Sequence, residues 1–284
     1  MNKLKYPLAI PVKAGLDLIN KYELRAETSL RDHVDDYAEY SNVLFSAHAP
    51  IEVNGQRLNV ASIDKDFQQY SVDVIKTYID RCAMLPNLTQ VNLHFGYKRW
   101  FADSQIQGRL GDYEKHISAV RDIAEYAYEY EIEIVMENLN SYWSANNISL
   151  ETQYDEVDWS NISEPFATCP DEWLKMCEDI NKPNVRLCLD TSHVCTYAQK
   201  LPVEERESEI MKFLNKPDLI NHVHWSDNYL YDIRGRQDSH LTVGTGTLPN
   251  DFHKIIIGLD ATILLEHYYS EDELAKELTF IDKL

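Results

Sequence analysis

A single (β/α)8 TIM barrel with a shortened first helix, covering residues 1–284 as one domain, is the fold that the sequence predicts. Eight short apolar runs alternate with segments that carry apolar residues at helical spacing, which is typical of parallel strands joined by crossover helices. The length of 284 residues is close to the roughly 250 residues that such a barrel commonly uses. No linker rich in Ser or Gly and no internal repeat divides the sequence.

The eight predicted strands are apolar almost to their last residue, as expected for strands that are covered on both faces. Residues 13–20, after the first strand, are too few for a full outer helix, and this connection is the shortened one. We expect strands at residues 6–12, 21–27, 43–49, 90–96, 132–138, 185–191, 219–226 and 261–267, and helices at residues 66–84, 113–131, 171–180, 203–215, 250–258 and 271–284.

A doubly wound open sheet is the competing architecture. Residues 9–15, at the end of the first strand, read AIPVKAG and contain neither G-x-G-x-x-G nor G-x-x-x-x-G-K-[ST], the phosphate-binding motifs of open sheets. The longest irregular stretches, residues 138–170 and 227–249, both follow a predicted strand. Because the loops at this end of a barrel build its active site, we expect the functional residues there.

The composition is strongly acidic. The chain carries 27 Lys and Arg against 47 Asp and Glu, a net charge of -20 at pH 7, and this field repels nucleic acid and anionic membranes. No run approaches the roughly 18 apolar residues of a membrane span, the first residues lack the apolar core of a signal peptide, and the five cysteines show no pairing pattern. We expect a cytoplasmic protein without disulfides. The sequence leaves open whether the chain forms a homo-oligomer.

Six consecutive predicted strands end on a residue that can bind a metal ion. Ionisable side chains at the ends of apolar strands are costly to bury unless they are paired, and a shared cation accounts for six together. Imidazoles and carboxylates without a thiolate favour zinc, manganese, cobalt or iron over calcium. His193 and His240 lie in the predicted loops after the sixth and seventh strands. The six strand-end residues are His48, His94, Glu137, Asp190, His224 and Glu266.

The other five histidines are predicted to have structural roles. They lie on helices, on alternate strand faces or just beyond a strand end. We expect His222 and His267 to point to the strand faces opposite those of the neighbouring ligands His224 and Glu266. The remaining three are His33, His116 and His253.

Short motifs in order along the chain carry a resemblance to a known family. They are SAHAP at residues 46–50, NVAS at 59–62, NLHFG at 92–96, MEN at 136–138, LCLDTSH at 187–193, VHWSD at 223–227, DSHLTVGTG at 238–246 and LE at 265–266. Together, from about residue 43 to residue 269, they resemble the xylose isomerase-like TIM-barrel superfamily. This superfamily includes sugar phosphate isomerases and epimerases, and the endonuclease IV group of DNA-repair enzymes.

The resemblance implies two alternative metal centres. In the isomerases and epimerases, the residues that match Glu137, Asp190, His224 and Glu266 hold one divalent ion (Mn, Zn, Co or Mg), and the match of His193 helps to bind substrate. In the endonuclease IV branch, these five and the matches of His48, His94, Asp238 and His240 hold three zinc ions. The sequence has a residue of the right type at all nine positions, so both centres stay open.

Charge favours the small-molecule branch, and the resulting prediction is a divalent-metal-dependent isomerase or epimerase of a sugar, sugar phosphate or other polyol. A bound ion stabilises the enediolate, Glu137 and Glu266 serve as base and acid, and His193 assists. The alternative is an endonuclease IV-like zinc phosphoesterase that cuts abasic DNA. A third reading is an oxidative enzyme, because the loop 137–142 leaves room for redox-active iron. We predict that Lys98, Arg99, Trp100, Trp225, Arg234 and Arg236 bind the substrate.

Overall fold

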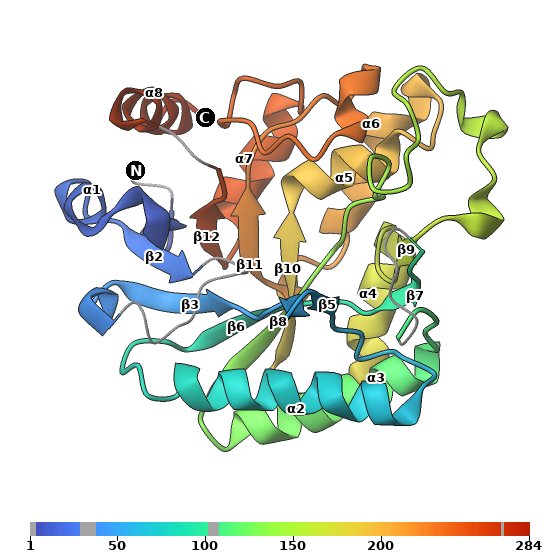
Figure 1. Cartoon of the computed structure of the whole chain (residues 1–284). Coiled ribbons are helices and arrows are strands. Elements are labelled where there is room, and N and C mark those ends of the chain that lie inside the picture. The colour runs from blue at the N-terminus through green and yellow to red at the C-terminus, as the bar shows by residue number, and fades with distance from the viewer. Residues whose placement is uncertain (1–3, 29–37, 102–107, 268–269) are drawn as a thin grey trace.

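A computed structural model describes residues 4–28, 38–101, 108–267 and 270–284 of the chain. Eight parallel strands close into one barrel in the order β1-β12-β11-β10-β8-β6-β3-β2 (Figure 1), which confirms the predicted fold class. The barrel closes where β1 pairs with β12, so the first and last strands of the chain are neighbours. The barrel strands are β1 (Ala9–Pro11), β2 (Arg25–Thr28), β3 (Leu44–His48), β6 (Gln90–His94), β8 (Glu133–Glu137), β10 (Val185–Asp190), β11 (Ile220–Trp225) and β12 (Thr262–Leu265).

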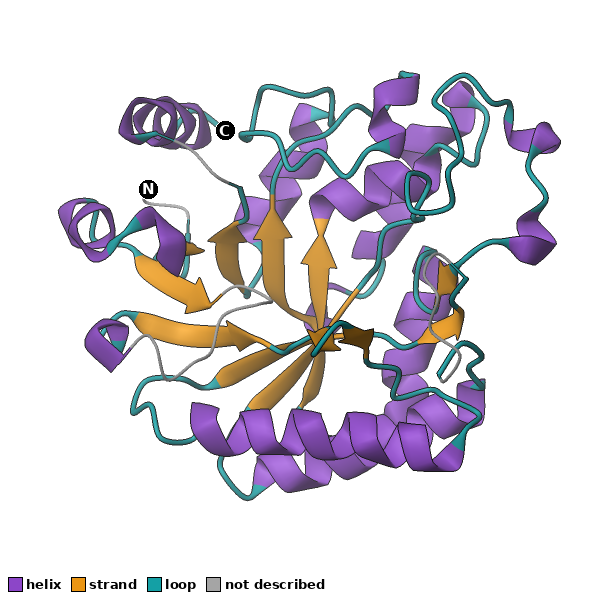
Figure 2. Cartoon of the chain, in the orientation of Figure 1, coloured by secondary structure: helices purple, strands orange, loops and turns teal. Residues whose placement is uncertain are grey.

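The helices surround the strands (Figure 2), and their apolar faces pack on the outside of the barrel. Asp64 and Asp112 accept backbone N–H groups at the starts of α2 and α3, and Pro170 occupies the first turn of α4. The first helix is short, as predicted, and has six residues. The helices are α1 (Leu16–Lys21), α2 (Lys65–Cys82), α3 (Tyr113–Tyr128), α4 (Pro170–Ile180), α5 (Thr191–Ala198), α6 (Val203–Met211), α7 (Asn250–Gly258) and α8 (Glu271–Ile281).

Many element boundaries differ from the sequence prediction by a few residues, and one difference, at the end of the sixth strand, changes the site. The second strand begins at Arg25 because Lys21 ends α1 and Glu23, with a φ of 54°, makes the turn between them. The sixth strand ends at Asp190, and α5, which we did not predict, begins at the next residue. His193 therefore lies in the first turn of a helix and not in a loop.

Two small antiparallel sheets shape the loops after the strands. β4 (Glu52–Val53) pairs with β5 (Gln56–Arg57) in the loop after β3. β7 (Tyr97–Arg99) pairs with β9 (Glu164–Pro165), which joins the loop after β6 to the long loop after β8.

The parallel register brings strand ends together. His94 is the register partner of Glu137, and Asp190 is the register partner of His224. All five cysteines are free thiols, and within the described ranges no helix is both long and apolar enough to span a membrane.

Candidate functional site

Seven of the nine predicted ligands fall into three groups at the carboxyl ends of the strands and in the segments that follow, and Glu266 and Asp238 lie beside these groups. Within each of these three groups, one donor atom of every residue lies within 4.8 Å of one donor atom of each other residue. Glu137 belongs to two of these groups and Asp190 belongs to two, so the groups follow one another in a row. They are His48 with His94 and Glu137, Glu137 with Asp190 and His224, and Asp190 with His193 and His240.

Glu137, at the end of β8, is the carboxylate around which three histidines gather. Its Oε2 lies 3.2 Å from Nε2 of His48 and 3.3 Å from Nε2 of His94, and its Oε1 lies 3.3 Å from Nδ1 of His193. Asn92 also donates to Oε2. Burial opposes the charge, but attraction to His94 and His224 and the hydrogen bonds hold the pKa of Glu137 well below its ordinary value. Glu137 is therefore an ionised carboxylate on the floor of the site.

Asp190 joins the end of β10 to the start of α5. Its Oδ1 accepts the backbone N–H of His193 at 2.8 Å, which is the N-cap contact of this helix. Its Oδ2 is buried and has no hydrogen-bond partner. Burial raises the pKa of Asp190 to about 7, although attraction to His193 and His240 opposes this shift. A cation at Oδ2 would stabilise the ionised form.

His193 and His240 meet at one carboxylate near the mouth. Nε2 of His193 lies 3.1 Å from Oδ2 of Asp238, and Nε2 of His240 lies 3.0 Å from Oδ1 of the same residue. Nδ1 of His193 lies 2.7 Å from the carbonyl oxygen of Asn138. Burial opposes protonation, yet attraction to Asp190 and Asp238 raises the pKa of His193 to about 10. His193 is therefore an imidazolium that donates hydrogen bonds from both ring nitrogens.

Glu266 follows β12 and faces His224. Its Oε2 lies 2.9 Å from Nδ1 of His224, but neither atom has a hydrogen bond of acceptable geometry. Burial opposes the shift, and attraction to His224 and His240 lowers the pKa of Glu266 to about 2. The Glu266 side chain is 25% exposed, whereas that of His224 is fully buried. Glu266 therefore links the floor of the site to its mouth.

The four predicted substrate-binding cations hold loops in place. Lys98 lies 3.0 Å from Glu172, and Arg99 lies 2.7 Å from Glu164 and donates to the carbonyl oxygens of residues 159 and 162. Arg234 is paired with its neighbour Asp232 at 2.8 Å. Arg236 donates to the carbonyl oxygens of residues 149, 150 and 152. These contacts tie the loops after β6, β8 and β11 together, and contact of the four side chains with substrate stays a prediction.

The two predicted tryptophans have different environments. Trp100 is 4% exposed and packs against Tyr142 and Tyr97, with ring centroids 5.2 and 4.7 Å away, and the guanidinium of Arg57 stacks on it. Trp225 has no exposed surface and donates to Nδ1 of His253 at 3.1 Å. Because Trp225 directly follows His224, its side chain leaves the strand on the opposite face. The structure does not bring Trp225 to the mouth.

Three other histidines pack away from the ligand groups. His116 accepts the backbone N–H of Gly96, and burial lowers its pKa to about 3. His253 accepts from Trp225, and His267 lies 3.0 Å from Glu277 of α8, on the face opposite Glu266 as predicted. His33 lies outside the described residues.

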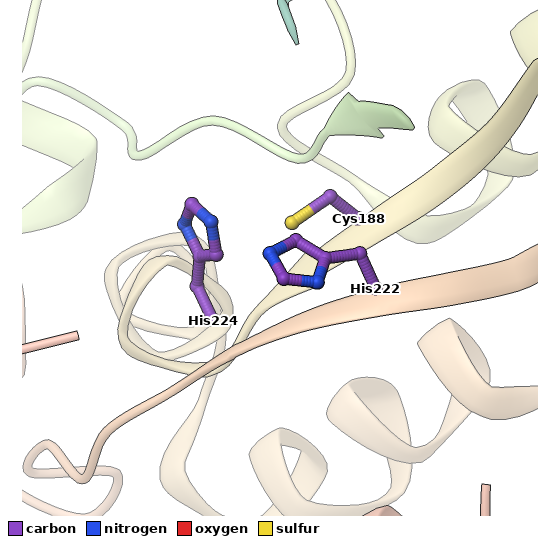
Figure 3. A group of neighbouring side chains, drawn as sticks. All are labelled: Cys188, His222 and His224. Carbon is purple, nitrogen blue, oxygen red and sulfur yellow. The ribbon is translucent and has the colours of Figure 1, made fainter. Parts of the chain in front are cut away.

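The prediction for His222 is wrong. His222 lies two residues before His224, so strand alternation places both on the same face. Both rings lie inside the barrel, with centroids 5.0 Å apart. Figure 3 shows the rings and Sγ of Cys188 directed toward one another, and one donor atom of each lies within 4.8 Å of the others.

Glu27 is the functional candidate that the sequence prediction missed. It lies in β2, is 1% exposed, and places its two oxygens 3.1 Å from Nε2 of His224 and 2.9 Å from Nε2 of His222. Burial would raise its pKa, but attraction to His224 and His222 holds the pKa of Glu27 well below its ordinary value. The signal was present, because Glu27 closes the second predicted strand as the other ligands close theirs.

Solved structures with the same fold include several sugar epimerases. A D-tagatose 3-epimerase-like protein has a TM-score of 0.67 at 20% identity, over 98% of this chain and 99% of that one. D-psicose 3-epimerase from Clostridium cellulolyticum H10 has a TM-score of 0.66 at 13% identity, over 98% and 99%. The 3-keto-D-glucoside 4-epimerase of E. coli has a TM-score of 0.61 at 12% identity, over 99% and 100%.

The structural likeness shows the fold, and a comparison with curated proteins gives no match. A family model provides the assignment. The model described as "Xylose isomerase-like TIM barrel" matches residues 12–284, which confirms the resemblance of the strand-end motifs. The chain therefore belongs to the xylose isomerase-like TIM-barrel family.

Proposed function

We propose that the chain is a divalent-metal-dependent isomerase or epimerase that acts on a sugar or sugar phosphate. The observation that carries this proposal is a set of three buried donor atoms without hydrogen bonds, two on residues of the group Glu137, Asp190 and His224 and one on Glu266 beside it. They are Oδ2 of Asp190, Nδ1 of His224 and Oε2 of Glu266. Buried polar atoms are rarely left unpaired, and one cation would satisfy all three.

The residues present fit such an ion. Glu137, Asp190, His224 and Glu266 offer carboxylate and imidazole donors, the set that suits manganese, cobalt, zinc or magnesium. When bound, a divalent ion supplies Lewis acidity that polarises a carbonyl group and stabilises the enediolate left when the neighbouring proton departs. The names of the structural neighbours support a sugar as the substrate.

The side chains at this centre can move the proton and hold the substrate. Glu137 and Glu266 are both ionised at neutral pH, so each can accept a proton from a carbon atom next to a carbonyl group. One carboxylate on each side of the carbon would allow removal on one face and return on the other. His193, as an imidazolium, places a positive charge at the site, and one of its N–H groups would have to leave Asp238 or Asn138 to donate to a substrate oxygen.

An endonuclease IV-like phosphoesterase is the second candidate, because the three ligand groups form a continuous row. Three observations weigh against it. The net charge of -20 repels a phosphate backbone, and Lys98, Arg99 and Arg234 at the loops are paired with carboxylates. The outer groups also contain histidines that already face carboxylate or carbonyl oxygens through both ring nitrogens, as His193 and His240 do.

One experiment separates the two candidates. The protein loaded with manganese or cobalt is incubated with a panel of ketoses and their phosphates in deuterated water, and in parallel with duplex DNA that carries an abasic analogue at low salt. Low salt is chosen because electrostatic binding is then strongest. We expect deuterium at the carbon next to the carbonyl of at least one ketose and intact DNA. Incision that is lost in His94→Ala and His240→Ala would establish the phosphoesterase instead.

A further inference from the structure

Glu27, His222 and Ser46 form a hydrogen-bonded layer next to His224 of the central ligand group. Glu27 reaches across the barrel interior from β2 to β11, where its Oε1 lies 3.1 Å from Nε2 of His224 and its Oε2 lies 2.9 Å from Nε2 of His222. The hydroxyl of Ser46, its register partner on β3, also donates to Oε2. Both oxygens of Glu27 are therefore occupied, and its carboxylate plane is fixed from two sides.

This contact determines which nitrogen of His224 can bind an ion. A neutral imidazole carries one proton, and an ionised carboxylate can only accept, so Nε2 of His224 must be the protonated nitrogen. When an ion binds, Nδ1, which lies 2.9 Å from Oε2 of Glu266 and 3.7 Å from Oε2 of Glu137, is then the nitrogen that would offer its lone pair to the ion. A histidine that binds a metal ion commonly donates its other ring N–H to a carboxylate in this way.

We propose that Glu27 is a positioning residue that fixes the tautomer and ring orientation of His224 for binding the divalent ion, with His222 and Ser46 holding Glu27 in place. The inference rests on the proposed function, because it assigns His224 to the ion of that site. It also explains why His222 lies inside the barrel although it contacts none of the central carboxylates: its Nε2 holds the second oxygen of Glu27.

The rival reading of the same layer is a separate ion held by Cys188, His222 and His224. Their donor atoms lie within 4.8 Å of one another (Figure 3). However, Nε2 of both histidines already faces Glu27, and Nδ1 of His222 lies 2.8 Å from Oγ1 of Thr262. Three of the four ring nitrogens are thus committed to Glu27 and Thr262, and the fourth, Nδ1 of His224, lies 2.9 Å from Oε2 of Glu266. Cys188 is a neighbour of the layer and not a ligand in this assignment.

The test measures metal affinity, which does not depend on knowing the substrate. Mn²⁺, Co²⁺ and Zn²⁺ are titrated into metal-free protein against a chromophoric chelator, and the visible absorption of the Co²⁺ form reports its coordination. Glu27→Gln keeps the shape of the side chain but replaces one carboxylate oxygen with an NH2 group. This NH2 group either faces the N–H of an imidazole, which is repulsive, or forces that imidazole into its other tautomer. We expect affinity to fall 10- to 100-fold and the Co²⁺ spectrum to change.

Three variants serve as controls. Glu133→Gln makes the same change in a carboxylate of the barrel interior that accepts from Gln90 and Asn221 at 2.8 and 2.9 Å and contacts no ligand, so we expect unchanged affinity. Cys188→Ala should bind as many ions as the wild type with the same spectrum. Ser46→Ala removes one support of Glu27 and should weaken binding less than Glu27→Gln does, and it keeps the test informative if Glu27→Gln does not fold.

Each outcome decides a separate question. Wild-type affinity and an unchanged Co²⁺ spectrum in folded Glu27→Gln would overturn the positioning role, as would unchanged affinity in Ser46→Ala if Glu27→Gln is unfolded. Loss of one ion in Cys188→Ala would establish the rival site. A wild-type protein that binds no divalent ion would instead refute the proposed function.

Discussion

Replacement of Glu137 by Gln perturbs the carboxylate that two ligand groups share. Oε2 of Glu137 faces His48, His94 and the amide of Asn92, and Oε1 faces His193. Glutamine keeps one accepting oxygen, so in either orientation at least one imidazole faces an NH2 group. A hydrogen bond to a charged group contributes about 1.5–3 kcal/mol, and its loss corresponds to roughly 10- to 150-fold weaker binding of the ion.

Turnover should fall further than ion binding, because an amide cannot accept the substrate proton. Loss of a general base costs about 10²–10⁴ in rate, so Glu137→Gln saturated with Mn²⁺ should exchange the substrate proton at least 100-fold more slowly. The assay is deuterium incorporation into the ketose that the wild type uses. Glu133→Gln, on the same strand and the same face four residues earlier, is the matched control. If Glu137→Gln retains a tenth of the wild-type rate, Glu137 is not the base.

Three further predictions follow from the same geometry. Metal-free protein returned to excess Mn²⁺ should bind one ion tightly per chain at pH 7 and regain its activity, because three unpaired donor atoms, on Asp190, His224 and Glu266, lie in or beside the central group, whereas the outer groups offer only Nδ1 of His94; elemental analysis that finds three tightly bound ions would contradict this. Ion affinity should fall about tenfold per pH unit below about pH 7, because Asp190, whose pKa burial raises to about 7, must lose its proton to bind; chelator competition between pH 5.5 and 8 measures this, and a flat profile would exclude Asp190 as a ligand. His193→Ala should lower kcat/KM at least tenfold with little change in ion affinity, since His193 already faces Asn138 and Asp238 through both ring nitrogens; full activity would rule out a role in substrate binding or catalysis.

The barrel could be predicted because strand periodicity and helical spacing are local properties of the sequence. Most of the predicted strands are largely apolar, and the side chain that closes each of them stands out against that background. This contrast identified the central residues Glu137, Asp190, His224 and Glu266. It failed at α5, where Asp190 appeared to end a strand and enter a loop, whereas its carboxylate also caps a helix. Because Asp190 both ends the strand and caps the helix, the sequence gives no separate signal for the start of the helix.

Side-chain partners across the barrel could not be predicted, because they depend on register and closure. Glu27 and His224 are 197 residues apart in the sequence, and they come into contact because the barrel closes through β1 and β12. The acidic partners of Lys98 and Arg99 come from residues more than 60 positions later, which β7 and β9 bring alongside. Sequence reading identified these cations as candidates for substrate binding, and the structure shows the carboxylates that already face them.

The arrangement of protons explains how one chain can carry the nine residues of a three-ion site and still be suited to a single ion. In the outer groups, most ring nitrogens of histidine face oxygen atoms: His48 lies between Ala49 and Glu137, His240 lies between Glu266 and Asp238, and only Nδ1 of His94 has no hydrogen-bond partner. An ion that binds to such a ring must first displace a hydrogen-bonding contact that the ring nitrogen already makes. At the centre, Asp190, His224 and Glu266 instead each leave one buried donor atom with no hydrogen-bond partner. The first cation therefore gains most at the centre, and each further ion competes with hydrogen bonds that the protein has already made.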